Sequence, residues 1–403
     1  MISLSQLQTN VHKRLKPDHT QKDYDVIVVG VGSMGSSTCY HLAKQGLKVL
    51  GIEQFDIPHE NGAHTGQTRI IRQAYFEHPS YVPLLKSAYD SWGQLEQESS
   101  SRLFFKTGLL YFGPEDHFLI KRSLESAHQH GIPINQISRQ EQESKYPQFD
   151  VPGYYTRMIE VDGGFIPPER AILTFTDQAL NNGAHIHTRE SVLEWKRKHG
   201  SIQVKTDKGV YSCKKLVLAS GAWSSKMVNT ELLNVTRQVI LWARTKMPDL
   251  FGLDHLPTWT YADPSVPGIY YGFPELPIES FGDPAGIKIA HHTKGEVTDP
   301  DNVKRTISKE EEVEVFENIQ KFIPDLESVV ASKTCLYTNS ADDDFIVDLH
   351  PENDDVVVAA GFSGHGFKFA SVMGEILKDL VTHGKTQHPI GFLSMKRFED
   401  KSR

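Results

Sequence analysis

The first residues with an evident chemical use form a glycine-rich turn. Gly30, Gly32 and Gly35 have the spacing G-x-G-x-x-G, between an apolar run at 24–29 and helix-compatible residues that continue to Gln45. The first glycine permits a tight turn, the second lets a pyrophosphate approach the backbone, and the third lets helix and strand pack closely. The pattern predicts a dinucleotide at the N-terminus of that helix.

An acidic residue follows at the distance expected for a ribose contact. Residues 47–52 form a second apolar run that ends on Glu53, eighteen residues after Gly35. A carboxylate there accepts hydrogen bonds from an adenosine ribose and disfavours a 2′-phosphate, so FAD or NAD is favoured over NADP. The glycine turn alone is also compatible with a purely structural role. Dinucleotide binding is favoured because the strand, the helix, the second strand and the acidic residue all follow at the expected spacing.

Other candidate residues are ambiguous when taken singly. Arg69 and Arg72 are spaced for one helical face, which indicates either a solvated basic face or the edge of a flavin or substrate site. Their place directly after the nucleotide-binding unit favours the second interpretation. Cys335 alone is typical of a buried core cysteine, and Lys288 alone is typical of a solvent-facing strand position.

Composition limits the class of protein. The chain has 403 residues, 38% of them hydrophobic, which suggests two domains or one large interleaved one. A net charge of −8 gives no basic footprint for nucleic acid or an anionic membrane, and no apolar run reaches the length of a membrane span.

Three distant cysteines, Cys39, Cys213 and Cys335, argue against a disulfide framework and for a reducing compartment, so we expect a cytoplasmic protein. Residues 1–23 lack a secretory signal and are expected to form a mobile extension or an added helix.

The order of elements predicts a discontinuous nucleotide domain. A second buried strand at 216–218 ends in a small-residue turn that suits another edge of the same site. A third, at 355–360, leads into a glycine-rich turn and a helix at about 370–382, whereas 237–295 is rich in strands. This pattern fits a substrate domain inserted into the nucleotide domain.

Four ordered motifs carry a resemblance over residues 24–397. The chain resembles the monomeric sarcosine oxidase and N-methyltryptophan oxidase family, FAD-dependent amine oxidases of the D-amino acid oxidase superfamily that include pipecolate oxidase. The motifs are the turn at 30–35, TRIIR at 68–72, GIYYGFP at 268–274 and GFSGHGFKF at 361–369.

The resemblance implies an α/β (α+β) fold, with a Rossmann-like FAD-binding domain and an interleaved antiparallel-sheet substrate domain. The implied segments are an N-terminal extension at 1–23, an FAD-binding domain at 24–103, 168–240 and 342–403, and a substrate domain at 104–167 and 241–341. It also implies a monomer that needs only its small-molecule substrate and O₂.

The implied activity is oxidation of the C–N bond of a secondary N-alkyl amino acid to an imine that hydrolyses, with O₂ reduced to H₂O₂. One alternative is an oxidase or dehydrogenase for another amine, such as a cyclic imino acid (pipecolate, proline) or a glycated amino acid. Another is a non-catalytic binder of FAD and a carboxylate, against which the joint presence of Arg72, Lys288 and Lys368 argues.

Roles follow residue by residue from the resemblance. Arg72 and Lys368 match the pair that grips the substrate carboxylate, and Lys288 matches the lysine that activates oxygen. Tyr271 and His292 match substrate contacts, Arg69 lies near the flavin ring, and Cys335 matches the covalent flavin attachment. The predicted FAD contacts are Gly30, Gly32, Ser33, Met34, Gly35, Glu53, Gln54, His59, Ala63, His64, Arg69, Val192, Ser220, Gly221, Trp223, Cys335, Gly364, His365, Gly366, Phe367 and Lys368.

One position departs from the family pattern. Relatives commonly place a histidine directly before the glycine of the arginine motif, where this chain has Thr65, with His64 one residue earlier. Threonine does not titrate near neutral pH, so the substrate range or pH profile is expected to differ.

Overall fold

The apolar run before the glycine turn forms the central strand of a mixed sheet in the computed structural model, which describes residues 2–228 and 230–402. Three residues lie outside the described part of the chain: Asn229, and Met1 and Arg403, which end the first and last predicted segments. Strand β1 (Asp23–Val29) pairs in parallel with β2 (Val49–Ile52) on one side and β11 (Val210–Leu218) on the other. Alternate side chains of β1 enter two different core clusters, which explains its continuous apolar character.

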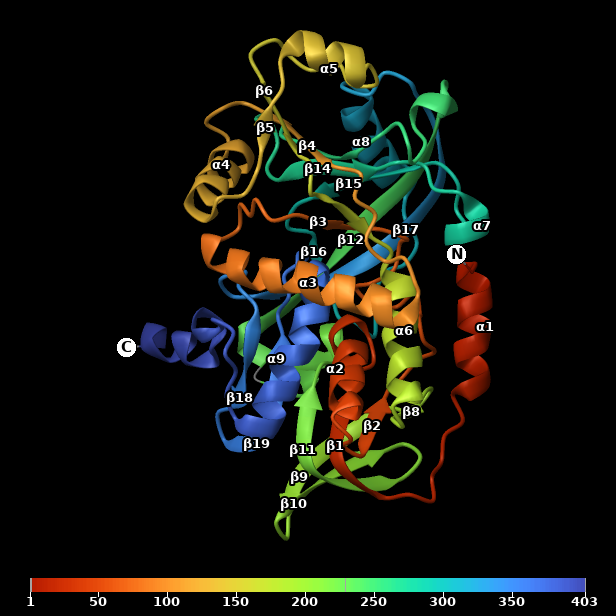
Figure 1. Ribbon diagram of the computed structural model, residues 1–403, viewed down its shortest axis with the longest axis vertical. Helices are drawn as coiled ribbons and strands as arrows, with labels where there is room; N and C mark the ends of the chain where they lie inside the picture. Colours follow the sequence, from red (N-terminus) through yellow and green to blue (C-terminus); the bar gives the residue numbers. More distant parts are fainter. Residues whose placement is uncertain (1, 229, 403) are drawn as a thin grey trace.

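This first sheet gathers strands from three distant parts of the chain. Its other members are β8 (His185–His187), β9 (Val192–Lys198), β10 (Ser201–Thr206), β18 (Ile346–His350) and β19 (Asn353–Ala360). The strand order is β18-β19-β11-β1-β2-β8, and the antiparallel hairpin β9–β10 continues from β11. Helices α2 (Ser33–Lys44), α6 (Pro168–Asn181) and α9 (Ala370–His383) pack together over one face (Figure 1).

The second large sheet lies above the first in Figure 1. Its strands are β4 (Leu109–Gly113), β5 (Asn135–Gln136), β6 (Thr156–Glu160), β12 (Leu233–Thr245), β13 (Thr258–Tyr261), β14 (Ile269–Phe273), β15 (Ile287–His292), β16 (Glu296–Val297) and β17 (Leu326–Ser340). All its pairings are antiparallel except β4–β13. The predicted α/β fold with an interleaved antiparallel sheet is confirmed.

The remaining elements cover or connect the sheets. They are α1 (Leu4–Arg14), α3 (Val82–Ser99), α4 (Phe118–His130), α5 (Arg139–Lys145), α7 (Ile278–Phe281) and α8 (Lys309–Gln320), strands β3 (Arg69–Ile71) and β7 (Gly164–Ile166), and 3₁₀ turns at Pro79–Tyr81, Gly221–Lys226, Thr230–Leu232, Pro248–Leu250, Phe367–Phe369, Gly391–Leu393 and Met395–Ser402. Among the described residues, no helix combines the length and apolar character that a bilayer span requires.

The N-terminal segment contains an added helix. Helix α1 lies along α6, and its Leu7 and Val11 are buried with Leu173 of α6 (Figure 1). Ser3 caps the helix by accepting a hydrogen bond from the Gln6 N–H at 3.1 Å. Residues 1–23 were expected to form either a mobile extension or an added helix. The structure has the helix, over Leu4–Arg14.

One expectation needs correction. Arg69 begins strand β3, which pairs with β7, so the arginine stretch is not helical. The β-branched residues Ile70 and Ile71 suit a short strand better than a helix. In addition, the predicted boundary at 240/241 falls inside β12, and we propose moving it to the start of that strand.

Candidate active site

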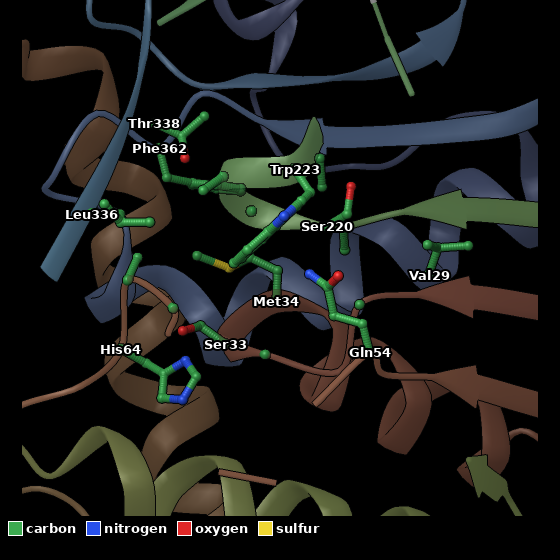
Figure 2. A pocket seen from close by; sticks show the side chains of 18 of the residues that line it. Val29, Ser33, Met34, Gln54, His64, Ser220, Trp223, Leu336, Thr338 and Phe362 are labelled. Carbon is green, nitrogen blue, oxygen red and sulfur yellow. The ribbon is translucent and has the colours of Figure 1, made fainter. Parts of the chain in front are cut away.

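A cavity of about 530 Å³ lies at the ends of β1, β2 and β11, where the glycine turn begins α2. Figure 2 shows its labelled wall residues facing a common hollow from several segments: Val29, Ser33, Met34, Gln54, His64, Ser220, Trp223, Leu336, Thr338 and Phe362. The carboxyl ends of the parallel strands β1, β2 and β11 meet at this edge of the first sheet. Strand β17 of the second sheet and the loop that carries His64 complete the wall.

The glycine turn has the geometry that a bound pyrophosphate requires. Gly30 has φ +88°, in the left-handed region. A Cβ on Gly35 would lie 1.7 Å from the Gly30 carbonyl oxygen, so helix and strand approach too closely for any side chain. A Cβ on Gly32 would meet no atom nearer than 4.0 Å, which leaves its backbone open to the cavity. With the unpaired N–H groups of α2, this cradle fits an anionic dinucleotide such as FAD.

Most of the predicted FAD contacts line this larger cavity. They are Gly30, Gly32, Ser33, Met34, Glu53, Gln54, His59, Ala63, His64, Arg69, Val192, Ser220, Gly221, Trp223, Gly364, Gly366 and Phe367. Gly35 packs behind the turn instead. Cys335, His365 and Lys368 line a second, smaller cavity.

Glu53 connects the turn to the second strand. One carboxylate oxygen accepts the Val31 N–H at 2.9 Å and the other accepts the Phe55 N–H at 3.0 Å. Burial raises the pKa of this carboxyl, and the backbone N–H groups partly oppose that shift. Glu53 therefore orders the turn directly, in addition to facing the cavity.

The segment after β19 closes the cavity from the other side. Gly364 has φ +75°, and a Cβ there would lie 2.5 Å from the ring of Tyr337. The segment continues through Phe367–Phe369 into α9, so the N-terminal end of that helix is turned toward the site.

The smaller cavity, of about 70 Å³, adjoins the larger one. Arg69, Tyr337, Gly364 and Phe367 line both. The rest of its wall combines cations with aromatic and aliphatic side chains: Ile70, Arg72, Phe76, Glu77, Thr260, Ile269, Tyr271, Phe273, His292, Cys335, His365 and Lys368.

Arg72 is buried and paired with an internal carboxylate. Its Nη2 lies 2.7 and 2.6 Å from the two carboxylate oxygens of Glu77, and its Nη1 donates to the Ala74 carbonyl at 2.9 Å. The turn that carries it is held by Glu160, which accepts the Gln73 N–H at 2.6 Å. Burial alone would raise the pKa of Glu77, but the charge of Arg72 overrides it and lowers the pKa to about 2. The pair is therefore ionised at neutral pH.

Lys368 shares an aromatic neighbour with Arg72. The Arg72 guanidinium carbon lies 4.4 Å from the ring centre of Tyr75, and the Lys368 Nζ lies 5.1 Å from it. Lys368 also donates to the His365 carbonyl at 2.6 Å. Burial, followed by the charge of Arg72, lowers the pKa of Lys368 to about 7, although Glu77 opposes the shift. The two predicted carboxylate-binding cations thus lie in one pocket.

The histidines of the smaller cavity are uncharged at neutral pH. Burial lowers the pKa of His292 to about 4 and that of His365 to about 3. His292 Nδ1 lies 3.1 Å from the Tyr337 hydroxyl, and His365 Nδ1 lies 2.5 Å from the Tyr75 hydroxyl. These rings contribute hydrogen bonds, whereas the positive charge comes from Arg69, Arg72 and Lys368.

Cys335 lies at the border between the cavities. Its buried thiol faces the smaller one, while the next residues along β17, Leu336 to Thr338, line the larger one. Burial raises the pKa of the thiol, and the nearby Arg69 and Lys288 charges partly offset this.

Lys288 and Thr65 line neither cavity. The Lys288 Nζ is buried beneath the loop before β3, where it donates to the carbonyls of Gly66 at 2.7 Å and Thr68 at 2.8 Å. Burial and the charge of Arg69 lower its pKa well below the ordinary value. Arg69 holds the same loop by donating to the Thr65 carbonyl at 2.7 Å.

Sequence reasoning did not identify several wall residues, above all Glu77 and Tyr337. Glu77 lies five residues after Arg72, directly after Tyr75 and Phe76. The chain turns between Arg72 and Glu77, so neither helical nor strand periodicity relates the two residues. Tyr337 stands two residues from Cys335 on β17, so alternation along that strand was the available signal.

The sequence matches a known family and is similar to several curated proteins. Residues 25–380 match the family model described as FAD dependent oxidoreductase. Monomeric sarcosine oxidase from Arthrobacter sp. (strain TE1826) is 38% identical, over 94% of this chain and 97% of that protein. N-methyl-L-tryptophan oxidase from Yersinia pestis (strain Pestoides F) is 31% identical, over 93% of this chain and all of that protein (100%).

Solved structures show the same fold. NikD, an unusual amino acid oxidase essential for nikkomycin biosynthesis, superposes with a TM-score of 0.81 at 23% identity, covering 93% of this chain and 98% of its own. The two-sheet architecture is therefore shared with that protein over nearly the whole length of both chains.

Proposed function

This chain belongs to the family of FAD-dependent oxidoreductases, and from that premise we propose that it oxidises small secondary amino acids at the C–N bond, in the manner that the names of its relatives describe. The observation that carries the proposal is the position of Arg72 and Lys368 on one small cavity beside the larger, dinucleotide-sized one. Two buried cations in a pocket with aromatic walls suit an amino acid carboxylate.

The size of the smaller cavity supports a small substrate. Its volume of about 70 Å³ is bounded by the rings of Phe76, Tyr271 and Phe273. Once a carboxylate is anchored on Arg72 and Lys368, little space is left beyond a short N-alkyl amino acid or a five- or six-membered ring. An indole or a sugar adduct would require the walls to move.

The residues of this chain would hold and orient the substrate. Arg72 offers a guanidinium fork and Lys368 a point charge, which together fix the carboxylate and hence the reacting C–H bond. Tyr271 and His292 border the remaining space and limit the orientations of the N-alkyl group. FAD, held by the glycine turn and Glu53, supplies the acceptor for the two electrons when it is bound.

We further propose that Cys335 is bonded covalently to the flavin. Its place on the shared border supports this, because a flavin ring at the inner end of the larger cavity would pass close to it. Burial of the sulfur between the two cavities also leaves it few other reaction partners. The bond would keep the cofactor in place through turnover.

Lys288 is proposed to assist reduction of O₂ to H₂O₂. The loop that Lys288 holds continues into Arg69, which lines both cavities, and an ammonium group there would lower the free energy of an anion formed from oxygen. Its two carbonyl partners, Gly66 and Thr68, hold the amine in one position. We also propose that the enzyme is cytoplasmic, since none of its three cysteines is in a disulfide, and that it acts as a monomer, as the name of its sarcosine-oxidising relative describes.

Anaerobic reduction of the holoenzyme tests the function. Sarcosine, other N-methyl amino acids, pipecolate and proline are mixed separately with the protein, and bleaching of the flavin absorbance is followed. We expect rapid bleaching by at least one of them, then one H₂O₂ per substrate once air is admitted. No bleaching with any of these would contradict the proposal and favour a non-catalytic binder. Bleaching followed by turnover only with an artificial dye would identify a dehydrogenase.

A further inference from the structure

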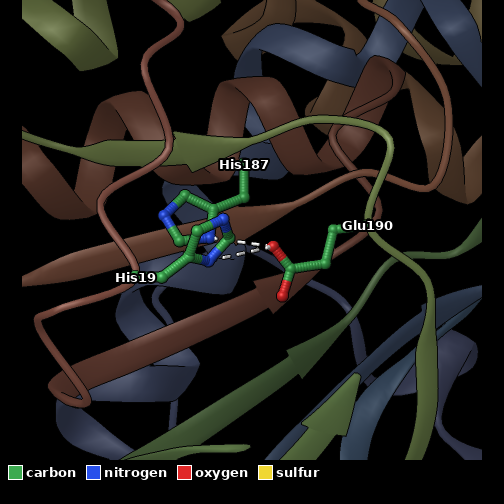
Figure 3. Close-up of side chains that lie close together, drawn as sticks. All are labelled: His19, His187 and Glu190. Carbon is green, nitrogen blue, oxygen red and sulfur yellow. Dashed lines mark hydrogen bonds and ion pairs between the residues drawn. The ribbon is translucent and has the colours of Figure 1, made fainter. Parts of the chain in front are cut away.

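A cluster of metal-ligand side chains lies beside the cofactor cavity, at the end of the edge strand β8 of the first sheet. His187 ends strand β8, and Glu190 follows in the loop after it. His19 comes from the segment between α1 and β1, which precedes residues 25–380 of the family match. Figure 3 shows the two imidazole rings converging on one carboxylate oxygen of Glu190.

The distances suit a single small ion. His187 Nδ1 lies 3.0 Å from Glu190 Oε2, and His19 Nδ1 lies 3.9 Å from the same oxygen. The three ligand atoms all lie within 4.8 Å of one another. Nitrogen and oxygen ligands at the usual zinc distances of about 2.0–2.2 Å in a tetrahedron are separated by roughly 3.3–3.5 Å, between the two observed values.

The charge of the cluster is unbalanced. Glu190 is fully buried (0% exposed), and its other oxygen accepts a hydrogen bond from the neutral hydroxyl of Thr206 at 2.6 Å. Among the described residues, its ion-pair partners are the two histidines and no lysine or arginine. A buried carboxylate without a fixed cation is costly, and a bound metal ion would offset its charge.

Hydrogen bonding is also incomplete. The second ring nitrogen of His187, Nε2, is buried without a partner. The Tyr211 hydroxyl reaches both rings, 2.8 Å from His19 Nδ1 and 3.4 Å from His187 Nδ1. This hydroxyl therefore serves the cluster as a hydrogen-bond partner.

We propose that His19, His187 and Glu190 form a binding site for a divalent transition-metal ion of the Zn²⁺ type. Two imidazoles and one carboxylate are a common zinc ligand set, which leaves a fourth position for water. The side chain of His19 is 41% exposed, so the ion can enter from solvent on that side.

The site would couple the N-terminal segment to the cofactor cavity. The Glu53 N–H donates to the His187 carbonyl at 2.8 Å, and the Glu190 N–H donates to the Glu53 carbonyl at 3.0 Å. Glu190 also lines the larger cavity, as do the three residues after it. A metal ion here would therefore stabilise both the attachment of residues 15–22 and the loop that borders the cofactor.

The experiment uses holoenzyme treated with a chelator and dialysed. ZnCl₂ is added at constant pH, and the binding heat, the bound metal per chain and the Tm are measured. We expect one Zn²⁺ per chain and a rise in Tm. His19→Ala should weaken the Zn²⁺ Kd at least tenfold and abolish most of the rise, because it removes one of three ligands.

Two further variants make the result decisive. His128→Ala removes an exposed histidine of α4 and should leave Zn²⁺ binding unchanged. Glu190→Gln should abolish binding; should it fail to fold, the exposed His19 variant still decides. No binding by the wild type up to millimolar Zn²⁺, or equal affinity in the His19→Ala protein, would overturn the proposal and leave a hydrogen-bonded cluster only.

Discussion

The guanidinium of Arg72 is bound by the carboxylate of Glu77, whose two oxygens lie 2.7 and 2.6 Å from one guanidinium nitrogen. Both side chains line the cavity proposed for the substrate. The cation that is expected to bind a substrate carboxylate therefore already holds one supplied by the protein. A substrate must replace Glu77 at Arg72 or share the arginine with it.

Removing this internal carboxylate should strengthen substrate binding. In Glu77→Gln, Arg72 loses its ionic competitor, so we expect the Kd of a non-oxidisable carboxylate such as propionate to fall by about tenfold, or about 1.4 kcal/mol. The Kd is measured on the holoenzyme from the change in flavin absorbance. Glu115→Gln, at an exposed loop position, serves as the control and should not change it. A weaker Kd would mean instead that Glu77 is needed to orient Arg72.

Carboxylate binding should weaken as pH rises above neutrality. In the free site the pKa of Lys368 is lowered to about 7 by burial and by Arg72. A bound carboxylate favours the ammonium form and raises this pKa, so binding takes up a proton above about pH 7. We expect a flat propionate Kd between pH 6 and 7 and an increase approaching tenfold per unit above it. The Lys368→Met protein should bind more weakly and lose this dependence, whereas a wild-type Kd constant up to pH 9 would refute the assignment.

The flavin should remain with the polypeptide after denaturation. Acid precipitation of the wild type is expected to leave the yellow colour in the pellet, since the Cys335 sulfur would be bonded to it. In Cys335→Ala the colour should move to the supernatant. Cys213→Ala, another buried cysteine that lines neither cavity, provides the matched control and should retain it. A colourless wild-type pellet would exclude the bond.

Lys288 should act on the oxygen half-reaction. Lys288→Met keeps the length of the side chain but removes its charge, and we expect reoxidation by O₂ to slow by about a hundredfold. Anaerobic reduction by substrate should change much less, because Lys288 does not line the smaller cavity. Stopped-flow absorbance separates the two steps. Lys294→Met, whose side chain is 90% exposed, should alter neither, and equal slowing of both steps by Lys288→Met would contradict the role.

Sequence alone was sufficient for the dinucleotide unit. The turn at Gly30–Gly35 and the acid at Glu53 lie within a single strand–helix–strand unit, where the spacing of residues determines the backbone geometry. The buried strand expected at 355–360 and the helix expected at about 370–382 were likewise found, as β19 and α9. The exception was the arginine stretch, in which a three-residue strand is too short for alternation to distinguish it from a helical turn.

Tertiary structure alone decided how distant charges are paired. Lys288 binds the carbonyl of Gly66, 222 residues away, and the fold brings Lys368 and Arg72 to the same tyrosine ring. The resemblance assigned roles to these residues, but the pairing of Arg72 with Glu77 and the meeting of His19 with Glu190 were not among its implications. Such contacts depend on how separate elements pack, and no local spacing in the sequence encodes them.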